Sequence, residues 1–135
     1  YIVDTSTDKV SDSILIGSSI GFLAVAVLCV NNIRDIESDS KVRKKTLAVR
    51  FGVAMITIVY DIMILSAYLS ILIFMFIEGF FNQLGMFLLF LSLPIAIKLI
   101  VDIHKSSRQQ LNLILFRTAI LIRTFSILLI IGILL

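Results

Sequence analysis

The chain has 135 residues, of which 59% are hydrophobic and 16% are charged, with a formal net charge of +3. Soluble domains are usually about half apolar and about a quarter charged, so a mean hydropathy of +1.10 argues against a water-soluble domain and favours a protein of the lipid bilayer. The basic charge does not indicate nucleic-acid binding, because no aromatic-rich basic surface accompanies the cations, and the single Cys29 excludes an internal disulfide.

Four apolar segments are long enough to cross the hydrocarbon core of a bilayer, which takes about 20 residues of helix. They run roughly over residues 14–30, 53–77, 84–101 and 111–135. Each is predicted to be helical, because a backbone exposed to lipid must satisfy its own hydrogen bonds. The predicted fold class is therefore all-α and transmembrane, with about four spanning helices. Glycine is typical of positions where such helices approach closely, and the candidates here are Gly17, Gly21 and Gly132.

Positive charges are concentrated in two of the connections between these segments. Residues 31–52 hold six Lys or Arg side chains, and the connection after the third segment holds Lys105 and Arg108. The turn near Glu78 carries no cation, and the segment before the first span is mostly acidic. Cytoplasmic loops are enriched in Lys and Arg, so both basic connections are predicted to be cytoplasmic and both termini to lie outside. The acidic residues before the first span are Asp4, Asp8 and Asp12.

The first basic connection, NNIRDIESDSKVRKKTLAVRFG, gathers amides, carboxylates and cations between two apolar segments. Asn31, Asp35 and Asp39 follow one another at intervals of four residues, and Asn32 precedes the same two aspartates by three and seven. These spacings line one side of a helix. We therefore expect the first span to continue for a couple of turns and to present this row at the cytoplasmic end of the bundle. Glu37 falls on the opposite side and is predicted to be solvated and uninvolved.

Two ionised carboxylates one helical turn apart repel each other, and a divalent cation relieves that repulsion. Mg²⁺ prefers oxygen ligands and usually takes one or two carboxylates, leaving other positions to water and phosphate. The sequence thus predicts Mg²⁺ on Asp35 and Asp39, with an amide oxygen of Asn31 or Asn32 nearby. The alternative is an ordinary charged loop with a helix start capped at Thr46. The side chains predicted to bind the diphosphate, among them cations and a hydroxyl that suit its oxygens, are Asn31, Asn32, Arg43, Lys44, Lys45, Thr46 and Arg50.

The strings NNIRDIESD and KKTLAVRFG together resemble the second Asp-rich motif of the UbiA-type membrane prenyltransferases. Weaker similarity runs through LPIAIKLI from Leu93 and LNLILFRTAIL from Leu111. The resemblance implies a bundle of nine helices around a central cavity, in which residues 1–135 form the C-terminal part, its last four helices. The resemblance does not extend to the family's first Asp-rich motif, and no signal-peptide pattern follows Tyr1. We therefore expect this chain to be the C-terminal part of a longer protein and to be inactive by itself.

Within that family, the resemblance is to the enzymes of menaquinone biosynthesis. It implies an integral enzyme of the bacterial inner membrane, dependent on Mg²⁺, that moves a polyprenyl group from a polyprenyl diphosphate to 1,4-dihydroxy-2-naphthoate. Decarboxylation would accompany the transfer and give demethylmenaquinone. Arg43 stands where the family commonly has Gly, which puts the geometry of that turn in question. The residues to which the resemblance gives roles are Asp35 and Asp39 as metal-side carboxylates, Arg34 and Asn32 as motif partners in catalysis, and Lys45 as a diphosphate contact.

Ionisable side chains also occur in the predicted spans. Asp61 lies about 12 Å along the helix from Val53 at 1.5 Å per residue, where a carboxylate is costly unless it is protonated, paired or facing a wet cavity. Arg117 is expected to extend to the cytoplasmic surface. Arg123 lies deeper and is a candidate partner of Asp61, whereas His104 is expected in the cytoplasmic loop.

Two other classes of protein remain open on the residues alone. A transport protein would use Asp61 and Arg123 as an ion or proton path and residues 31–52 as a gate. A non-catalytic membrane subunit would use only its spans. The transport reading does not explain why two aspartates keep helical register with two amides ahead of Lys-Lys-Thr. Metal-dependent binding of an isoprenoid diphosphate would distinguish the enzyme from both.

Overall fold

The computed structural model describes residues 5–135 and shows an all-helical chain, as predicted. Asp4, one of the acidic residues that entered the orientation argument, falls outside the described residues. No β-strand occurs in the described part. The α-helices are α1 (Thr5–Arg34), α2 (Ile36–Lys41), α3 (Leu47–Phe51), α4 (Val53–Glu78), α5 (Leu93–Lys105) and α6 (Leu111–Leu134), and the 3₁₀ helices are η1 (Leu84–Ser92) and η2 (Arg108–Gln110).

Four segments of the described chain are long and apolar enough to span a membrane, which confirms the predicted number. The third is not one regular α-helix, because its first nine residues form η1. Pro94, in the first turn of α5, has no N–H and would leave the carbonyl of Phe90 unpaired in a continuous α-helix. The N–H of Leu93 bonds to that carbonyl instead, in the tighter 3₁₀ pattern. The four segments are Lys9–Arg34, Val53–Glu78, Leu84–Lys105 and Arg108–Leu134.

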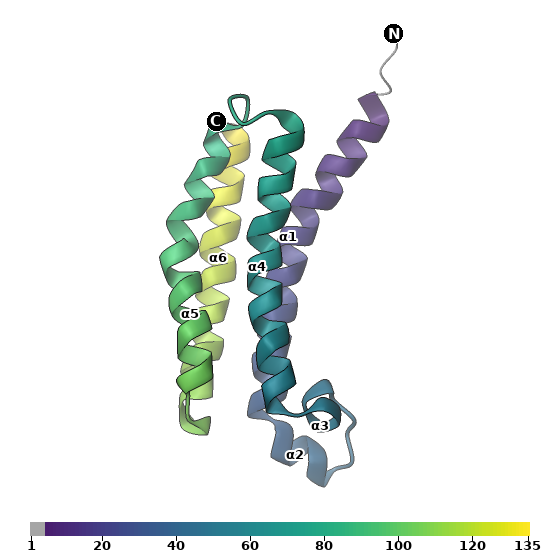
Figure 1. Cartoon of the computed structure of the whole chain (residues 1–135), viewed down its shortest axis with the longest axis vertical. Helices are drawn as coiled ribbons and strands as arrows, with labels where there is room; N and C mark the ends of the chain where they lie inside the picture. The colour runs from purple at the N-terminus through teal and green to yellow at the C-terminus, as the bar shows by residue number, and fades with distance from the viewer. Residues whose placement is uncertain (1–4) are drawn as a thin grey trace.

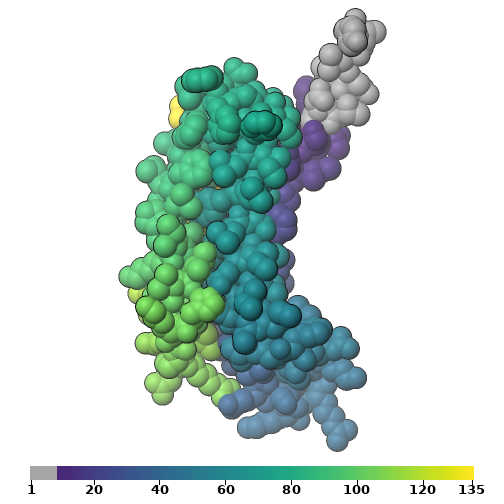
Figure 2. All heavy atoms as spheres, viewed as in Figure 1, coloured from purple at the N-terminus to yellow at the C-terminus, as the bar shows by residue number. Residues whose placement is uncertain are grey.

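The long helices stand side by side, with α1 packed along α4 and α6 packed against both α1 and η1 (Figure 1). The beginning of α1 diverges from α4, whereas its second half follows it closely (Figure 1). The connection that carries α2 and α3 and the connection through η2 lie at one end, and the end of α6 lies at the other (Figure 1 and Figure 2). The two basic connections therefore share one end of the bundle, as the positive charges predict.

Two buried hydroxyl pairs join the helices inside the bundle. The Tyr60 hydroxyl lies 2.9 Å from Thr118 Oγ1 and links α4 to α6, and the Tyr68 hydroxyl lies 2.7 Å from Ser92 Oγ at the end of η1. The ring of Tyr68 also meets Phe125 edge to face, with centroids 5.3 Å apart. Each pair satisfies polar atoms that would otherwise be unpaired in an apolar medium, so the pairs fix which faces of the helices meet.

Two glycines allow the backbones of η1 and α6 to approach closely. A Cβ added at Gly85 would lie 2.4 Å from the Gly132 carbonyl oxygen, and one added at Gly132 would lie 2.8 Å from the oxygen of Gly85. The predicted close approach at Gly132 is therefore confirmed. Gly17 and Gly21 make no such approach to the described part of the chain, because an added Cβ meets nothing there within 4 Å.

Candidate functional site

The polar connection begins with a break in the helix at Asp35. The first long helix ends at Arg34, Asp35 takes a turn conformation (φ −94°, ψ 7°), and α2 follows. The expected unbroken helix is therefore wrong at this residue. The Asp35 N–H still donates to the Asn31 carbonyl at 3.0 Å, and the Asp39 N–H to the Asp35 carbonyl at 2.9 Å. The four-residue hydrogen-bonding register that links these residues thus continues across the break.

Asp35 is held by its neighbour Arg34. Nε of Arg34 lies 2.7 Å from Oδ1 and its Nη2 2.8 Å from Oδ2, a bidentate pair. Hydrogen bonding to the guanidinium, followed by its positive charge, lowers the pKa of Asp35, so the carboxylate is ionised at neutral pH. An ionised carboxylate has about four lone-pair positions, and Arg34 takes two. Asp35 therefore retains acceptor capacity for a further cation.

Asp39 is the buried carboxylate of the connection, with a side chain 12% exposed. Nζ of Lys44 lies 3.4 Å from its Oδ1, and the backbone N–H of Lys44 donates to the Asp39 carbonyl at 2.8 Å. The segment after α2 therefore folds back and places a cation beside the carboxylate. Among the sequence-predicted site residues, the structure brings Asp39 together with Lys44, and Asp35 with Arg34.

The fold-back turns at Arg43, which has φ 57° and is the non-glycine residue with positive φ in the described part of the chain. Its N–H donates to the Ser40 carbonyl at 3.1 Å. The left-handed region costs an L-residue about 1–2 kcal/mol and costs Gly almost nothing. The conformation gives a physical reason for the glycine that the resemblance places here: the turn needs a left-handed residue.

Changing Arg43 to Gly should therefore raise the unfolding free energy of the full-length protein by about 1 kcal/mol. Since the guanidinium is also predicted to contact the diphosphate, KM for that substrate should rise. Thermal unfolding and steady-state kinetics measure the two effects separately. Arg43→Ala is the matched control, because it removes the guanidinium and keeps a Cβ. An equal gain of stability in Arg43→Ala would show that backbone conformation is not the cause.

Thr46 caps a helix, as the alternative interpretation of this connection predicts. Its backbone is extended and its Oγ1 accepts the Val49 N–H at 3.4 Å, which starts α3. Because Oγ1 acts there as an acceptor, its own O–H remains available to donate. Lys45 and Arg50 are exposed and have no ion pair with a described residue, and Asn31 and Asn32 are half-buried with no side-chain hydrogen bond inside the described chain. No hydrogen bond or ion pair links these last four side chains to one another in the described part of the chain.

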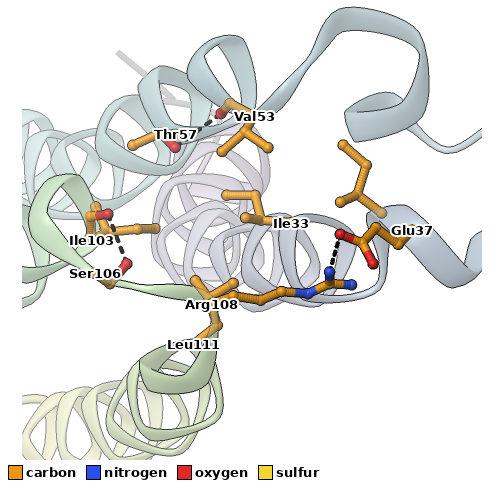
Figure 3. A pocket seen from close by; sticks show the side chains of 9 residues that line it. Ile33, Glu37, Val53, Thr57, Ile103, Ser106, Arg108 and Leu111 are labelled. Atoms are coloured by element: carbon orange, nitrogen blue, oxygen red, sulfur yellow. Dashed lines mark hydrogen bonds and ion pairs between the residues drawn. The ribbon is translucent and has the colours of Figure 1, made fainter.

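A pocket of about 200 Å³ lies beside the motif (Figure 3). It lies between the last turns of α1 and α5 and the first turns of α4 and α6. Its walls are mainly aliphatic, and its charged lining residues are Glu37 and Arg108. The hydroxyls of Thr57 and Ser106 are bonded to carbonyls in their own helices. The interior therefore offers little unsatisfied polarity. The lining residues are Ile33, Ile36, Glu37, Val53, Thr57, Ile103, Ser106, Arg108 and Leu111.

Glu37 and Arg108 point toward each other across this pocket and form an ion pair between α2 and η2 (Figure 3). Glu37 is solvated, as predicted, with a side chain 63% exposed, and its partner Arg108 is not one of the residues predicted to bind metal or diphosphate. Hydrogen bonding to Arg108 lowers the pKa of Glu37. The contribution of the pair to stability is therefore complete above the ordinary Glu pKa and is lost as pH falls through the lower folded value.

The charged side chains inside the spans pair differently from the prediction. Oδ2 of Asp61 lies 2.6 Å from Nε2 of His104, so the proposed Asp61–Arg123 contact is wrong. His104 belongs to the last turn of α5 and not to a loop. Arg117 is paired with Asp102, Nη1 to Oδ2 at 3.2 Å. The exposed Arg123 has no ion pair with any residue that the structure describes. Sequence alone gave no signal for these partners, because it does not show which helices are neighbours.

Comparison with known proteins gives a family and a short local match. Residues 2–132 match the UbiA prenyltransferase family. The 1,4-dihydroxy-2-naphthoate octaprenyltransferase of Haemophilus influenzae is 66% identical over 32 residues, which are 24% of this chain and 10% of that protein. The matched region thus spans a small part of the relative's length. No solved structure matches the chain significantly.

Proposed function

Because this chain belongs to the UbiA prenyltransferase family, we propose that it is part of a multi-pass membrane enzyme that transfers a polyprenyl group from its diphosphate to 1,4-dihydroxy-2-naphthoate. The family match over residues 2–132 carries the prenyltransferase assignment. The acceptor depends on the local identity to the naphthoate enzyme. We take the chain as the C-terminal part of the enzyme, with the α2–α3 end on the cytoplasmic face of a bacterial inner membrane, because the cations gather there.

The donor atoms at α2 fit one half of a magnesium site. Within residues 5–135 no group of three His, Cys, Asp or Glu side chains could hold a metal ion. Mg²⁺ needs only one or two protein carboxylates when phosphate and water supply the rest, and Asp35 and Asp39 would provide two. When bound, Mg²⁺ would stabilise negative charge on the diphosphate. The first Asp-rich motif of the full-length protein would complete the site.

The side chains that follow Asp39 would bind the diphosphate oxygens. The Lys44 side chain is 64% exposed even though it lies beside Asp39, so its ammonium can also donate to phosphate. Lys45 and Arg50 are exposed, and the free O–H of Thr46 can donate a further hydrogen bond. These donors stabilise charge that grows on the leaving oxygens as the allylic C–O bond weakens. Their role in this proposal is to bind the leaving group and to hold it at the membrane surface.

The transfer balances without a separate proton acceptor. The allylic C–O bond breaks and its electron pair leaves with the diphosphate, while the ring carbon that bears the carboxylate of the acceptor bonds to the allylic carbon. The carboxylate leaves as CO₂, and the electron pair of its C–C bond returns to the ring. The immediate product is a quinol, which yields demethylmenaquinone on oxidation. An apolar site that excludes water protects the allylic cation from hydrolysis.

Incubation of the purified full-length protein with a polyprenyl diphosphate and candidate acceptors tests the proposal. Mass spectrometry should detect the prenylated, decarboxylated naphthalenediol; EDTA should abolish it and added Mg²⁺ restore it. Prenylation of 4-hydroxybenzoate in place of the naphthoate would refute the acceptor but keep the reaction class. Absence of both products and of metal-dependent isoprenoid diphosphate binding would refute the enzyme and favour a transport or non-catalytic role.

A further inference from the structure

A groove runs between α5 and α6 and consists of two adjoining cavities that share Lys98 and Arg117. The cavity nearer the connection between the helices measures about 440 Å³, and most of its lining side chains are polar or charged. The other, about 380 Å³, lies farther along both helices and is largely apolar. The groove is thus polar at one end and apolar at the other. The residues used below are Asp102 and Lys105 in the first cavity, and Pro94, Leu99 and Ile120 in the second.

The polar end of the groove has an excess of positive charge. Arg117 is balanced by Asp102 at 3.2 Å. Lys98 and Lys105 are exposed and have no ion pair within the part of the chain that the structure describes. Lys98 lies seven residues before Lys105, the last residue of its membrane-spanning segment, or about 10 Å deeper at 1.5 Å per residue. A cation at such a depth is costly unless it reaches the interface or meets an anion.

We propose that this groove binds an anionic phospholipid of the surrounding leaflet. Its phosphate would lie between Lys98 and Lys105, and an acyl chain would follow Pro94, Leu99 and Ile120 into the bilayer. Basic pockets between transmembrane helices on the cytoplasmic side suit anionic head groups. A bilayer lipid also supplies the apolar part that the deeper cavity requires. The groove lies between two helices, so a lipid there would tie α5 to α6.

The chemistry of the groove distinguishes this ligand from the prenyl substrate. The only carboxylate among its described lining residues is Asp102, and Arg117 already neutralises it. A diphosphate with its metal ion needs free carboxylates, whereas a single phosphate needs only cations. The inference therefore depends on Lys98 and Lys105, neither of which belongs to the proposed diphosphate site, and it stands apart from the proposed reaction.

Thermal unfolding of the purified full-length protein in detergent tests the inference. Phosphatidylglycerol should raise the unfolding midpoint, whereas phosphatidylcholine should not. In the double variant Lys98→Gln/Lys105→Gln, the half-saturating concentration of phosphatidylglycerol should rise about thirtyfold. This factor corresponds to the loss of about 1 kcal/mol of binding free energy for each of the two cations. Lys41→Gln is the control, because it removes an exposed cation outside the groove. This variant should respond to phosphatidylglycerol as the unchanged protein does.

Three results would overturn the inference. They are an unchanged response in the double variant, an equal loss in Lys41→Gln, and the same effect, also lost in the double variant, from inorganic phosphate or polyprenyl diphosphate alone. The first excludes the groove, the second indicates diffuse surface charge, and the third assigns the anion to another source. If the Gln variant unfolds without lipid, Lys98→Arg/Lys105→Arg keeps both charges and should retain the response; loss of the response in that folded variant would also contradict it.

Discussion

Replacing Asp39 by Asn in the full-length enzyme should lower kcat by about a hundredfold to a thousandfold, the usual cost of removing one group that stabilises transition-state charge. The Asp39 side chain is nearly buried and lies 3.4 Å from Lys44. Asn has almost the same shape but no charge, so it would no longer balance a metal ion or this ammonium. Asp35→Asn should also lower kcat and would in addition release Arg34, which now holds both oxygens of Asp35.

Steady-state rates measured over a range of Mg²⁺ concentrations test this result. The concentration of Mg²⁺ that gives half-maximal rate should rise in both variants, which a purely structural role would not require. Glu78→Gln is the matched control, because it removes a carboxylate at the opposite end of α4, at its last residue. A rate within about threefold of the unchanged enzyme in Asp39→Asn, with the same Mg²⁺ dependence, would exclude Asp39 from the metal site.

The spans could be predicted because length and apolar composition decide them. The second predicted span, residues 53–77, differs from α4 by one residue at its end. The third predicted span differs from the structure in helix type, because it begins with the 3₁₀ helix η1. Hydropathy does not distinguish a 3₁₀ helix from an α-helix. The signal in that span is Pro94, which favours a helix start near Leu93. Hydropathy also could not show that α1 extends from Thr5 to Arg34, beyond the apolar core of the span.

The site could be predicted where its contacts are local. The spacing of Asp35 and Asp39 and the cap at Thr46 depend on residues a few positions apart, and both are present. Contacts between distant residues could not be predicted, because they depend on which helices are neighbours. Asp61 and His104 are 43 positions apart. Their pairing, like that of Glu37 and Arg108, follows from the packing of several helices together.

Replacing Gly85 by Ala should destabilise the protein by about 3 kcal/mol, the upper part of the range for overpacked sites. The new methyl carbon would lie 2.4 Å from the carbonyl oxygen of Gly132 and 3.1 Å from its Cα. Both atoms belong to the backbone of α6, so no flexible side chain can move aside. Because packing largely drives helix association in a membrane, separating η1 from α6 should lower the unfolding free energy measured in mixed micelles.

Gly17→Ala is the control for this prediction, because it adds the same methyl group to another glycine of a membrane span. A Cβ at Gly17 meets nothing within 4 Å in the described structure, and Ala favours a helix over Gly by about 0.5–1 kcal/mol. The two substitutions should therefore change stability in opposite directions. Gly132→Ala should act like Gly85→Ala, and the double variant should cost less than the sum, since both disrupt one contact. Equal effects at Gly85 and Gly17 would show that the backbones of η1 and α6 do not meet in the membrane.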